Sequence, residues 1–276
     1  MLLRRPSIAP AGRGELTVTK RGDRSVVTRA YATSPLRWLT PANHGHAAWV
    51  YTSSHGGGLV NGDAVVMDVD VEDGATALVS TQASTKVYPS PDGVRSDLRA
   101  SVGAEGLLAV VPDPVVCFAG ARYCQLVEVD LADGAALVLL DWMTSGRRAS
   151  GERWAFDEYT AALRVRRGDR WLVFDAMSLR ADDGELPERL GRYDVCATVV
   201  VVGPALAGHA ARIIELAQRP RVARRPDMLT AASTVDATGC VARVLGTSLE
   251  GATRTIRDWL SFLPGTLGDD PWCRKW

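Results

Sequence analysis

Residues 64–81 read AVVMDVDVEDGATALVST, two strand-like runs, Ala64–Val71 and Ala75–Thr81, on either side of the turn Glu72-Asp73-Gly74. In the first run the apolar side chains at 65, 67, 69 and 71 alternate with a second set that includes Asp68 and Asp70. Alternation with a period of two is typical of a strand with one buried face. This stretch therefore predicts a β-protein.

Similar runs and turns recur along most of the chain. Asp-Gly and Gly-Asp pairs supply the positive φ of tight hairpin turns. The turns follow one another at a spacing of roughly 30 residues, which is long enough for a strand pair per unit. One interpretation is a structural repeat of stacked strand layers. The other, which we favour, is that the turns belong to independent hairpins that look alike. The turns are Glu72-Asp73-Gly74, Ala104-Glu105-Gly106, Ala132-Asp133-Gly134 and Arg167-Gly168-Asp169.

Two segments near the C-terminus have helical spacing instead. Ala205–Arg219 lies between two prolines, and Glu250–Leu263 carries an apolar stripe that ends at Pro264-Gly265. No low-complexity linker divides the chain. We therefore expect residues 1–276 to form a single mainly β domain of stacked antiparallel or mixed sheets, β-helix-like or sandwich-like, with two α-helices toward the C-terminus. About the first 14 residues are expected to be disordered.

Composition and charge exclude several classes of protein. The chain has 276 residues, 46% of them hydrophobic, and a formal net charge of zero, which argues against a nucleic-acid binder. Apolar runs are too short to span a bilayer, and the N-terminus has no secretory apolar region. The cysteines are odd in number and widely spaced, which indicates reduced thiols and a cytoplasmic protein. They are Cys117, Cys124, Cys196, Cys240 and Cys273.

The glycine run Gly56-Gly57-Gly58 follows His55 and resembles the oxyanion loop of some esterases. That chemistry needs a serine in a G-x-S-x-G elbow, which the sequence lacks. A dinucleotide-binding loop starting at Gly56 would need glycine where Asn61 stands. The sequence thus predicts no enzyme, and the run is interpreted as a flexible loop between strands.

Three histidines, His44, His46 and His55, lie close together in the sequence. Imidazole is a good nickel ligand, and residues two apart on a strand share a face. A weak metal site formed by these histidines is one hypothesis. Exposed loop histidines are the alternative.

Three ordered motifs together resemble the UreD (UreH) family of urease accessory proteins. Gly56 to Asp63 matches a G-G-G-L-V-x-G-D element, with Gly62 inside it. Thr81 to Tyr88 matches T-Q-A-x-T-K-V-Y, and Pro112 to Arg122 matches P-D-P-[VI]-x-x-F-x-G-[AS]-R. A looser G-R-x-x-x-G-E-x-W stretch follows at residues 146–154. The resemblance covers almost the whole chain, with Asn61 and Ser84 as small departures.

The resemblance implies a non-catalytic scaffold that helps to insert Ni²⁺ into apo-urease. Ni²⁺ would be carried or passed on, not kept as a cofactor. The implied partners are UreF, the GTPase UreG and the urease apoprotein, with possible homodimerisation through the accessory complex. A tunnel through the protein is the implied ion route. Candidate motif and tunnel residues are Gly56, Gly57, Gly58, Gly62, Asp63, Asp68, Asp70, Thr81, Gln82, Lys86, Tyr88, Asp113 and Arg122.

The predicted helix Glu250–Leu263 is the candidate partner surface, through Arg254, Arg257 and Trp259. Arginine and aromatic residues are enriched at binding hot spots. Its apolar stripe is equally typical of a helix packed on a core. The alternative to the scaffold function is a β-sandwich module that binds a carbohydrate or another ligand.

Overall fold

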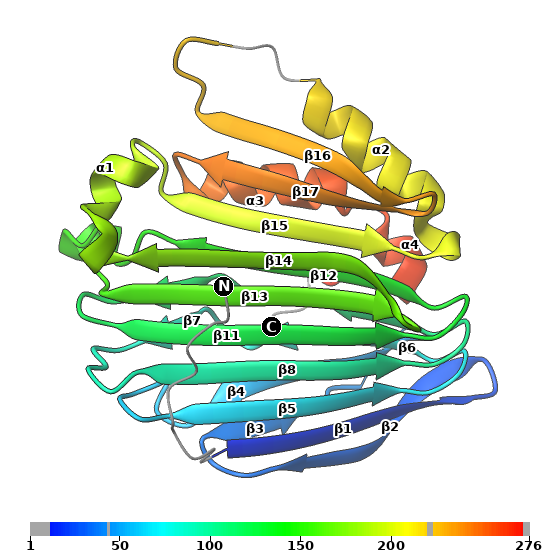
Figure 1. The fold of residues 1–276 in the computed structure, drawn as a ribbon. Coiled ribbons are helices and arrows are strands. Elements are labelled where there is room, and N and C mark those ends of the chain that lie inside the picture. Colours follow the sequence, from blue (N-terminus) through cyan, green and yellow to red (C-terminus); the bar gives the residue numbers. More distant parts are fainter. Residues whose placement is uncertain (1–11, 43–44, 220–222, 273–276) are drawn as a thin grey trace.

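The computed structural model describes residues 12–42, 45–219 and 223–272. The predicted mainly β architecture with stacked mixed sheets is confirmed (Figure 1). The strands are β1 (Gly12–Arg21), β2 (Arg24–Ala32), β3 (Leu36–Leu39), β4 (Ala48–Ser54), β5 (Ala64–Val71), β6 (Thr76–Thr81), β7 (Thr85–Val87), β8 (Val94–Val102), β9 (Leu107–Val110), β10 (Val115–Cys117), β11 (Arg122–Leu131), β12 (Ala136–Thr144), β13 (Glu158–Arg167), β14 (Arg170–Arg180), β15 (Val195–Val202), β16 (Met228–Asp236) and β17 (Gly239–Gly246).

The strands form two sheets that lie one behind the other. The front sheet has seven strands in the order β14-β13-β11-β8-β5-β1-β2. The back sheet has ten strands, with β16-β17-β15-β12-β9-β6-β4-β3 in order, β10 beside β12 and β7 beside β10. Both sheets have a parallel centre, β1 to β13 in front and β4 to β12 behind, with antiparallel strands at their edges.

In the parallel centre of the fold the chain alternates between the sheets instead of forming hairpins. Glu72-Asp73-Gly74 connects β5 in the front sheet to β6 in the back sheet, and the next two turns connect β8 to β9 and β11 to β12. Of the four predicted hairpins only Arg167-Gly168-Asp169 joins paired neighbours, β13 and β14. The hairpin prediction was wrong for the other three because a short Asp-Gly turn reverses the chain equally well between stacked sheets.

The turns stack on one another, so the roughly 30-residue spacing is a structural repeat. Ala64 pairs with Arg95, and Val94 pairs with Tyr123, in adjacent parallel strands. At the turns, the Gly74 N–H donates to the Ala104 carbonyl at 2.8 Å. In return the Ala104 N–H donates to the Asp73 carboxylate at 2.7 Å. The preference for independent hairpins over a repeat was therefore wrong, and the fold is β-helix-like in its centre.

Apolar side chains fill two layers. One core lies between the sheets and includes Leu16, Val69, Leu98 and Leu137. The other lies between the back sheet and the helices, around Trp49, Trp142 and Trp259. The central back-sheet strands therefore bury both faces, which is why runs such as Val195–Val202 are apolar at almost every position.

The two long helices are confirmed close to their predicted positions. They are α2 (Ala207–Gln218) and α3 (Leu249–Trp259), and the short helices are α1 (Leu186–Leu190) and α4 (Leu263–Leu267). The Ser248 hydroxyl caps α3 by accepting from the Gly251 N–H at 3.1 Å. Strand β1 begins at Gly12, inside the segment expected to be disordered, and residues 1–11 lie outside the described residues.

Candidate functional site

The first two sequence motifs meet at the end of the strands opposite the stacked turns. The Leu59 N–H donates to the Lys86 carbonyl at 2.8 Å, and the Tyr88 N–H donates to the Leu59 carbonyl at 2.9 Å. A Cβ atom on Gly58 would lie 2.6 Å from the Tyr88 ring and 2.8 Å from the Lys86 oxygen. Glycine at position 58 therefore permits a close approach of the two loops.

The second and third motifs also touch. The Asp113 N–H donates to the Thr81 hydroxyl at 2.8 Å, and that hydroxyl lies 3.3 Å from the Asp113 carboxylate. Beside them the Ser53 hydroxyl donates to the Gln82 side-chain oxygen at 2.6 Å. Thr81, Gln82 and Asp113 line one cavity of about 230 Å³ between the two sheets. This first cavity reaches the surface near Gly57 and Ala83, both exposed.

Asp141 lies at the deep end of the first cavity, on β12. The Gln125 amide, on β11 of the opposite sheet, donates to its carboxylate at 2.7 Å. The Tyr123 hydroxyl donates to the Gln125 oxygen at 3.2 Å. Burial raises the pKa of Asp141 to about 6; the Gln125 hydrogen bond opposes this shift, and the negative charge of Asp175 adds to it. Asp141 keeps some accessible surface because it faces the cavity.

A second cavity, of about 570 Å³, shares Asp141 with the first. It lies between β13 and β14 of the front sheet and β12, β15, β17 and β16 of the back sheet. The fully buried Tyr159 lines it, and its hydroxyl has no hydrogen-bond partner among the described residues. Asp141 therefore lines both cavities. The Tyr159 hydroxyl is a buried polar group at the second cavity.

The family model for "UreD urease accessory protein" matches residues 11–276. The chain belongs to the UreD family of urease accessory proteins. The "Urease accessory protein UreD" of Sorangium cellulosum (strain So ce56) is 52% identical over 96% of this chain and 85% of its own length. That of Anaeromyxobacter sp. (strain Fw109-5) is 41% identical over 96% and 89%. "Urease accessory protein D" of Oryza sativa subsp. indica is 34% identical over 96% of both chains.

Several predicted tunnel residues of this UreD-family chain do not line either cavity. The Asp63 carboxylate accepts from the Val60 N–H at 2.8 Å and so closes its own loop. Lys86 is exposed, and the Tyr88 ring packs edge-on against Phe118 with centroids 5.0 Å apart. Arg122 forms an exposed ion pair with Asp157 at 3.3 Å. Gly56 and Gly62 have positive φ in the same loop, so they shape it without facing the cavity.

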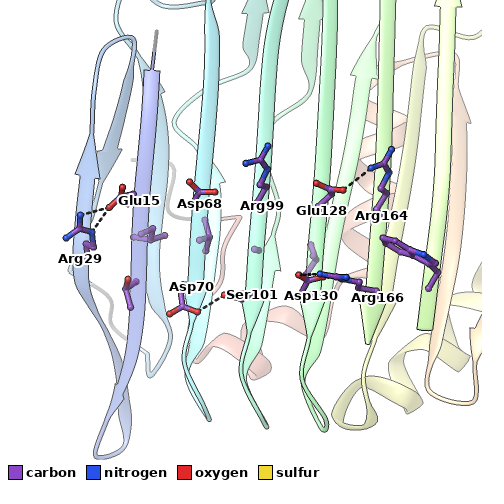
Figure 2. Close-up of a pocket in the computed structure, with 16 residues that line it drawn as sticks. Glu15, Arg29, Asp68, Asp70, Arg99, Ser101, Glu128, Asp130, Arg164 and Arg166 are labelled. Carbon is purple, nitrogen blue, oxygen red and sulfur yellow. Dashed lines mark hydrogen bonds and ion pairs between the residues drawn. The ribbon is translucent and has the colours of Figure 1, made fainter. Parts of the chain in front are cut away.

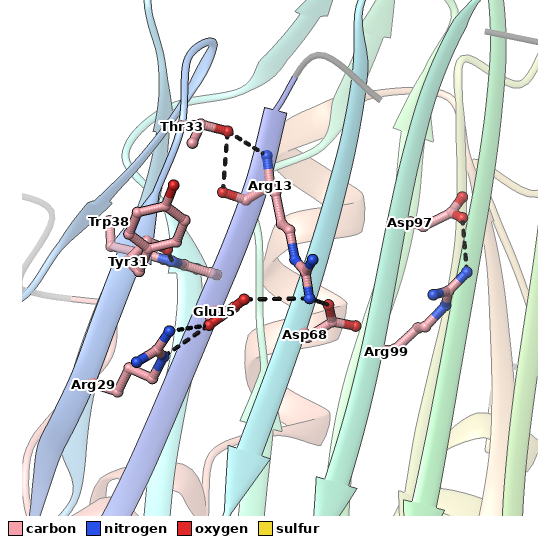
Figure 3. A network of polar contacts seen from close by, with 9 residues as sticks. All are labelled: Arg13, Glu15, Arg29, Tyr31, Thr33, Trp38, Asp68, Asp97 and Arg99. Carbon is pink, nitrogen blue, oxygen red and sulfur yellow. Dashed lines mark hydrogen bonds and ion pairs between the residues drawn. The ribbon is translucent and has the colours of Figure 1, made fainter. Parts of the chain in front are cut away.

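Asp68 and Asp70 lie on the outer face of the front sheet, so their assignment to the tunnel was wrong. They line a shallow depression together with Glu15, Arg99 and Arg166 (Figure 2). The Ser101 hydroxyl donates to Asp70 at 2.6 Å, and Arg13 lies 3.9 Å from Asp68 (Figure 3). Val65, Val69 and Val71 of β5 point toward the interior, and strand alternation therefore turns Asp68 and Asp70 outward.

The histidine hypothesis was wrong for the pair that the structure describes. His46 and His55 flank the two ends of β4, a strand of seven residues, and so lie roughly 20 Å apart. His44 lies outside the described residues. Within residues 12–42, 45–219 and 223–272, no group of three or more histidine, cysteine or acidic side chains could hold a metal ion.

The described cysteines are all buried and free. Burial raises the pKa of Cys196 to about 12 and that of Cys240 to about 11. These two thiols are therefore protonated at neutral pH. Cys273 lies outside the described residues.

Trp259 is a core residue, so its assignment to a partner surface was wrong. Its side chain is 3% exposed and packs between α3 and the back sheet. Arg254 and Arg257 face outward on the same helix. Arg254 pairs with Glu250 at 2.9 Å, and the Arg257 guanidinium lies 5.2 Å from the Trp272 ring centroid. No described helix is long and apolar enough to cross a membrane.

The predicted site residues did not include Asp141, Tyr159, Asp175 and Arg243. For Asp141 a signal existed: it is a single carboxylate inside the apolar run Ala136–Met143. A charge in a strand buried on both faces is costly unless it has a partner or a function. The partner, Gln125, comes from the other sheet and could not be identified from spacing.

Proposed function

We propose that this protein is a non-catalytic scaffold for urease maturation whose interior passes Ni²⁺ toward apo-urease. The observation that carries the proposal is Asp141, a buried carboxylate that joins two cavities in a chain of the UreD family. Carboxylate and amide oxygens can hold a divalent cation through water, whereas a thiolate cage would retain it. A single carboxylate of this kind suits an ion in transit.

The proposed route enters beside Thr81, Gln82 and Asp113, which line the first cavity. It continues to Asp141, where the Gln125 hydrogen bond favours the ionised carboxylate. At pH 7 to 8, above its pKa of about 6, Asp141 carries the charge that attracts a cation. Below that pH the site loses the charge, and passage slows.

The proposed partners follow from the family resemblance. We infer a cytoplasmic complex with a UreF-type protein, a UreG-type GTPase and the urease apoprotein, in which two copies of the chain can come together. The exposed cations Arg254 and Arg257 make the outer side of α3 a candidate contact. This surface is separate from both cavities, so assembly and ion passage can be tested independently.

The test is expression of the urease genes with and without this chain, followed by measurement of urease activity and nickel content. We expect assembled but nickel-poor urease in its absence. Full activity without the chain would contradict the proposal and favour a ligand-binding module. In the complete system, Asp141→Asn should lower nickel content, while the outer-face variant Asp70→Asn should not. Equal nickel content in the two variants, with the complex intact, would remove Asp141 from the route.

A further inference from the structure

The interior has a second approach to the surface at the edge of the front sheet. The front sheet ends at β14, whereas the back sheet continues past β12 with β15, β17 and β16 (Figure 1). The second cavity lies between these end strands and includes Ala176, Leu229 and Ala231, which are exposed. The space that contains Asp141 therefore extends sideways to the surface, away from the three motif loops.

A row of polar residues crosses the back sheet from Asp141 to this opening. Asp141 pairs with Thr198 on β15, and Thr198 pairs with Arg243 on β17. Residues in register on adjacent strands point to the same face, and all three line the second cavity. The neighbouring positions on that face are apolar or weakly polar, among them Met143, Cys196 and Leu245. The row is a polar track in an otherwise apolar space.

An ion pair spans the two sheets at the outer end of this row. The Arg243 guanidinium on β17 lies 2.9 Å from the Asp175 carboxylate on β14. The side chains are 57% and 31% exposed, respectively, so the pair stands at the boundary between cavity and solvent. A pair this exposed contributes little to stability and opens readily.

A second ion pair between the same two sheets provides a comparison. Arg167, at the end of β13, lies 3.5 Å from Asp236, at the end of β16. These side chains are more buried, and the Arg167 guanidinium also donates to the Ala135 carbonyl at 3.4 Å. Neither residue lines a cavity. The Arg167–Asp236 pair therefore holds the sheet edges together, whereas Asp175–Arg243 is the one that borders the cavity.

We propose that the cleft between β14 and β17 is a lateral mouth of the interior and that the Asp175–Arg243 pair closes it to cations. The closed pair places a fixed positive charge at the mouth and occupies the Asp175 carboxylate. When the pair opens, Asp175 faces the cavity that contains Asp141, and two carboxylates then lie along one path. The role of the ion pair rests on the proposed cation-passing function. The mouth itself can be tested on the isolated chain.

Cys196 reports on access through this mouth because it lines the second cavity on the same face as Thr198. The probe is aminoethyl methanethiosulfonate, a small cationic thiol reagent, applied to the full chain, with peptide mass spectrometry to locate the modified cysteine. Arg243→Gln should increase the rate of Cys196 modification at least about ten-fold, because a cation barrier at a cleft is removed. Cys117 and Cys240 lie outside the second cavity, so their rates should stay unchanged.

Three comparisons decide the outcome. Arg167→Gln, the matched control, should leave the Cys196 rate close to that of the unmodified chain. The exchanged pair Asp175→Arg with Arg243→Asp should restore slow modification. Neutral methyl methanethiosulfonate should show a smaller difference between Arg243→Gln and the unmodified chain than the cationic reagent. If Arg243→Gln unfolds at the assay temperature, Asp175→Asn is tested instead; it leaves the Arg243 charge unpaired at the mouth and should slow modification by the cationic reagent but not by the neutral one.

Equal Cys196 rates in Arg243→Gln and Arg167→Gln would overturn the lateral mouth. A parallel rise at Cys117 and Cys240 would also overturn it, because general loosening of the fold would then explain the result. The labelling involves neither nickel nor urease. A failure here therefore removes the lateral mouth and leaves nickel delivery to its own test, and loss of the delivery function would leave the labelling result intact.

Discussion

Gln125 on the front sheet donates a hydrogen bond to Asp141 on the back sheet across the interior, with the two atoms 2.7 Å apart. The bond supports a carboxylate whose burial costs free energy, and it connects the two sheets at the junction of two cavities. The pKa of Asp141 is raised to about 6 despite this bond, because burial is the larger effect. The first two predictions test this arrangement.

Asp141→Asn should stabilise the fold at pH 8. The folded-state pKa of about 6 lies above the ordinary value of 3.8, so the ionised form is disfavoured in the folded protein. Unfolding free energy in the unmodified chain therefore falls as pH rises from about 4 to 6, by on the order of 3 kcal/mol. The variant lacks this loss, so its advantage should be largest above pH 6 and shrink toward pH 4. Urea unfolding across that pH range measures it; a pH-independent difference would contradict the raised pKa.

Gln125→Leu should destabilise the fold at pH 8 by about 1–3 kcal/mol, because a buried carboxylate loses its partner. The pKa of Asp141 should rise further, since the hydrogen bond that opposes the burial effect is removed. Below pH 5 the cost should decrease, because the protonated carboxyl needs the bond less. The control is the same change in the Asp141→Asn background, where the pH dependence should vanish; its persistence would point to another titrating group.

Trp259→Ala should cost about 3–5 kcal/mol of unfolding free energy, because a large buried side chain is removed. Arg254→Glu should change stability by less than about 0.5 kcal/mol, since its partner Glu250 and the arginine are both exposed. Thermal and urea unfolding measure the stability of both variants.

In pull-downs with a UreF-type partner, Arg254→Glu should weaken recovery of that partner. Recovery at the level of the unmodified chain would remove α3 from the interface.

Gly58→Ala should destabilise the motif loops by about 1–3 kcal/mol. The new Cβ atom would lie 2.8 Å from the Lys86 carbonyl, and backbone cannot move aside as a side chain can. Gly208→Ala in α2 is the control: its Cβ would meet nothing within 4 Å, and alanine in a helix gains up to about 1 kcal/mol. Hydrogen exchange at Leu59 and Tyr88 should rise in Gly58→Ala alone. Unchanged exchange there would show that the loops tolerate the extra atom.

The sequence alone was sufficient for the mainly β character, the two long helices and the family. Alternation with a period of two identifies a half-buried strand from local residues, and the apolar stripe of Glu250–Leu263 identifies a helix in the same local way. Three ordered motifs identified the UreD resemblance without any knowledge of where they meet. The same alternation also contained the correct outward direction of Asp68 and Asp70, since Val65, Val69 and Val71 occupy the opposite positions.

Only the tertiary structure decided which strands pair and which polar groups meet. A short turn such as Glu72-Asp73-Gly74 permits either a hairpin or a change of sheet, and the free-energy difference comes from pairing with strands about 30 residues away. Gln125 and Asp141 lie on opposite sheets, and Asp175 and Arg243 are brought together by two sheet edges. Such contacts depend on how layers stack, so no local spacing encodes them. The sequence therefore determined the mainly β character, the two long helices and the family, and the packing of two sheets created the interior and its charged mouth.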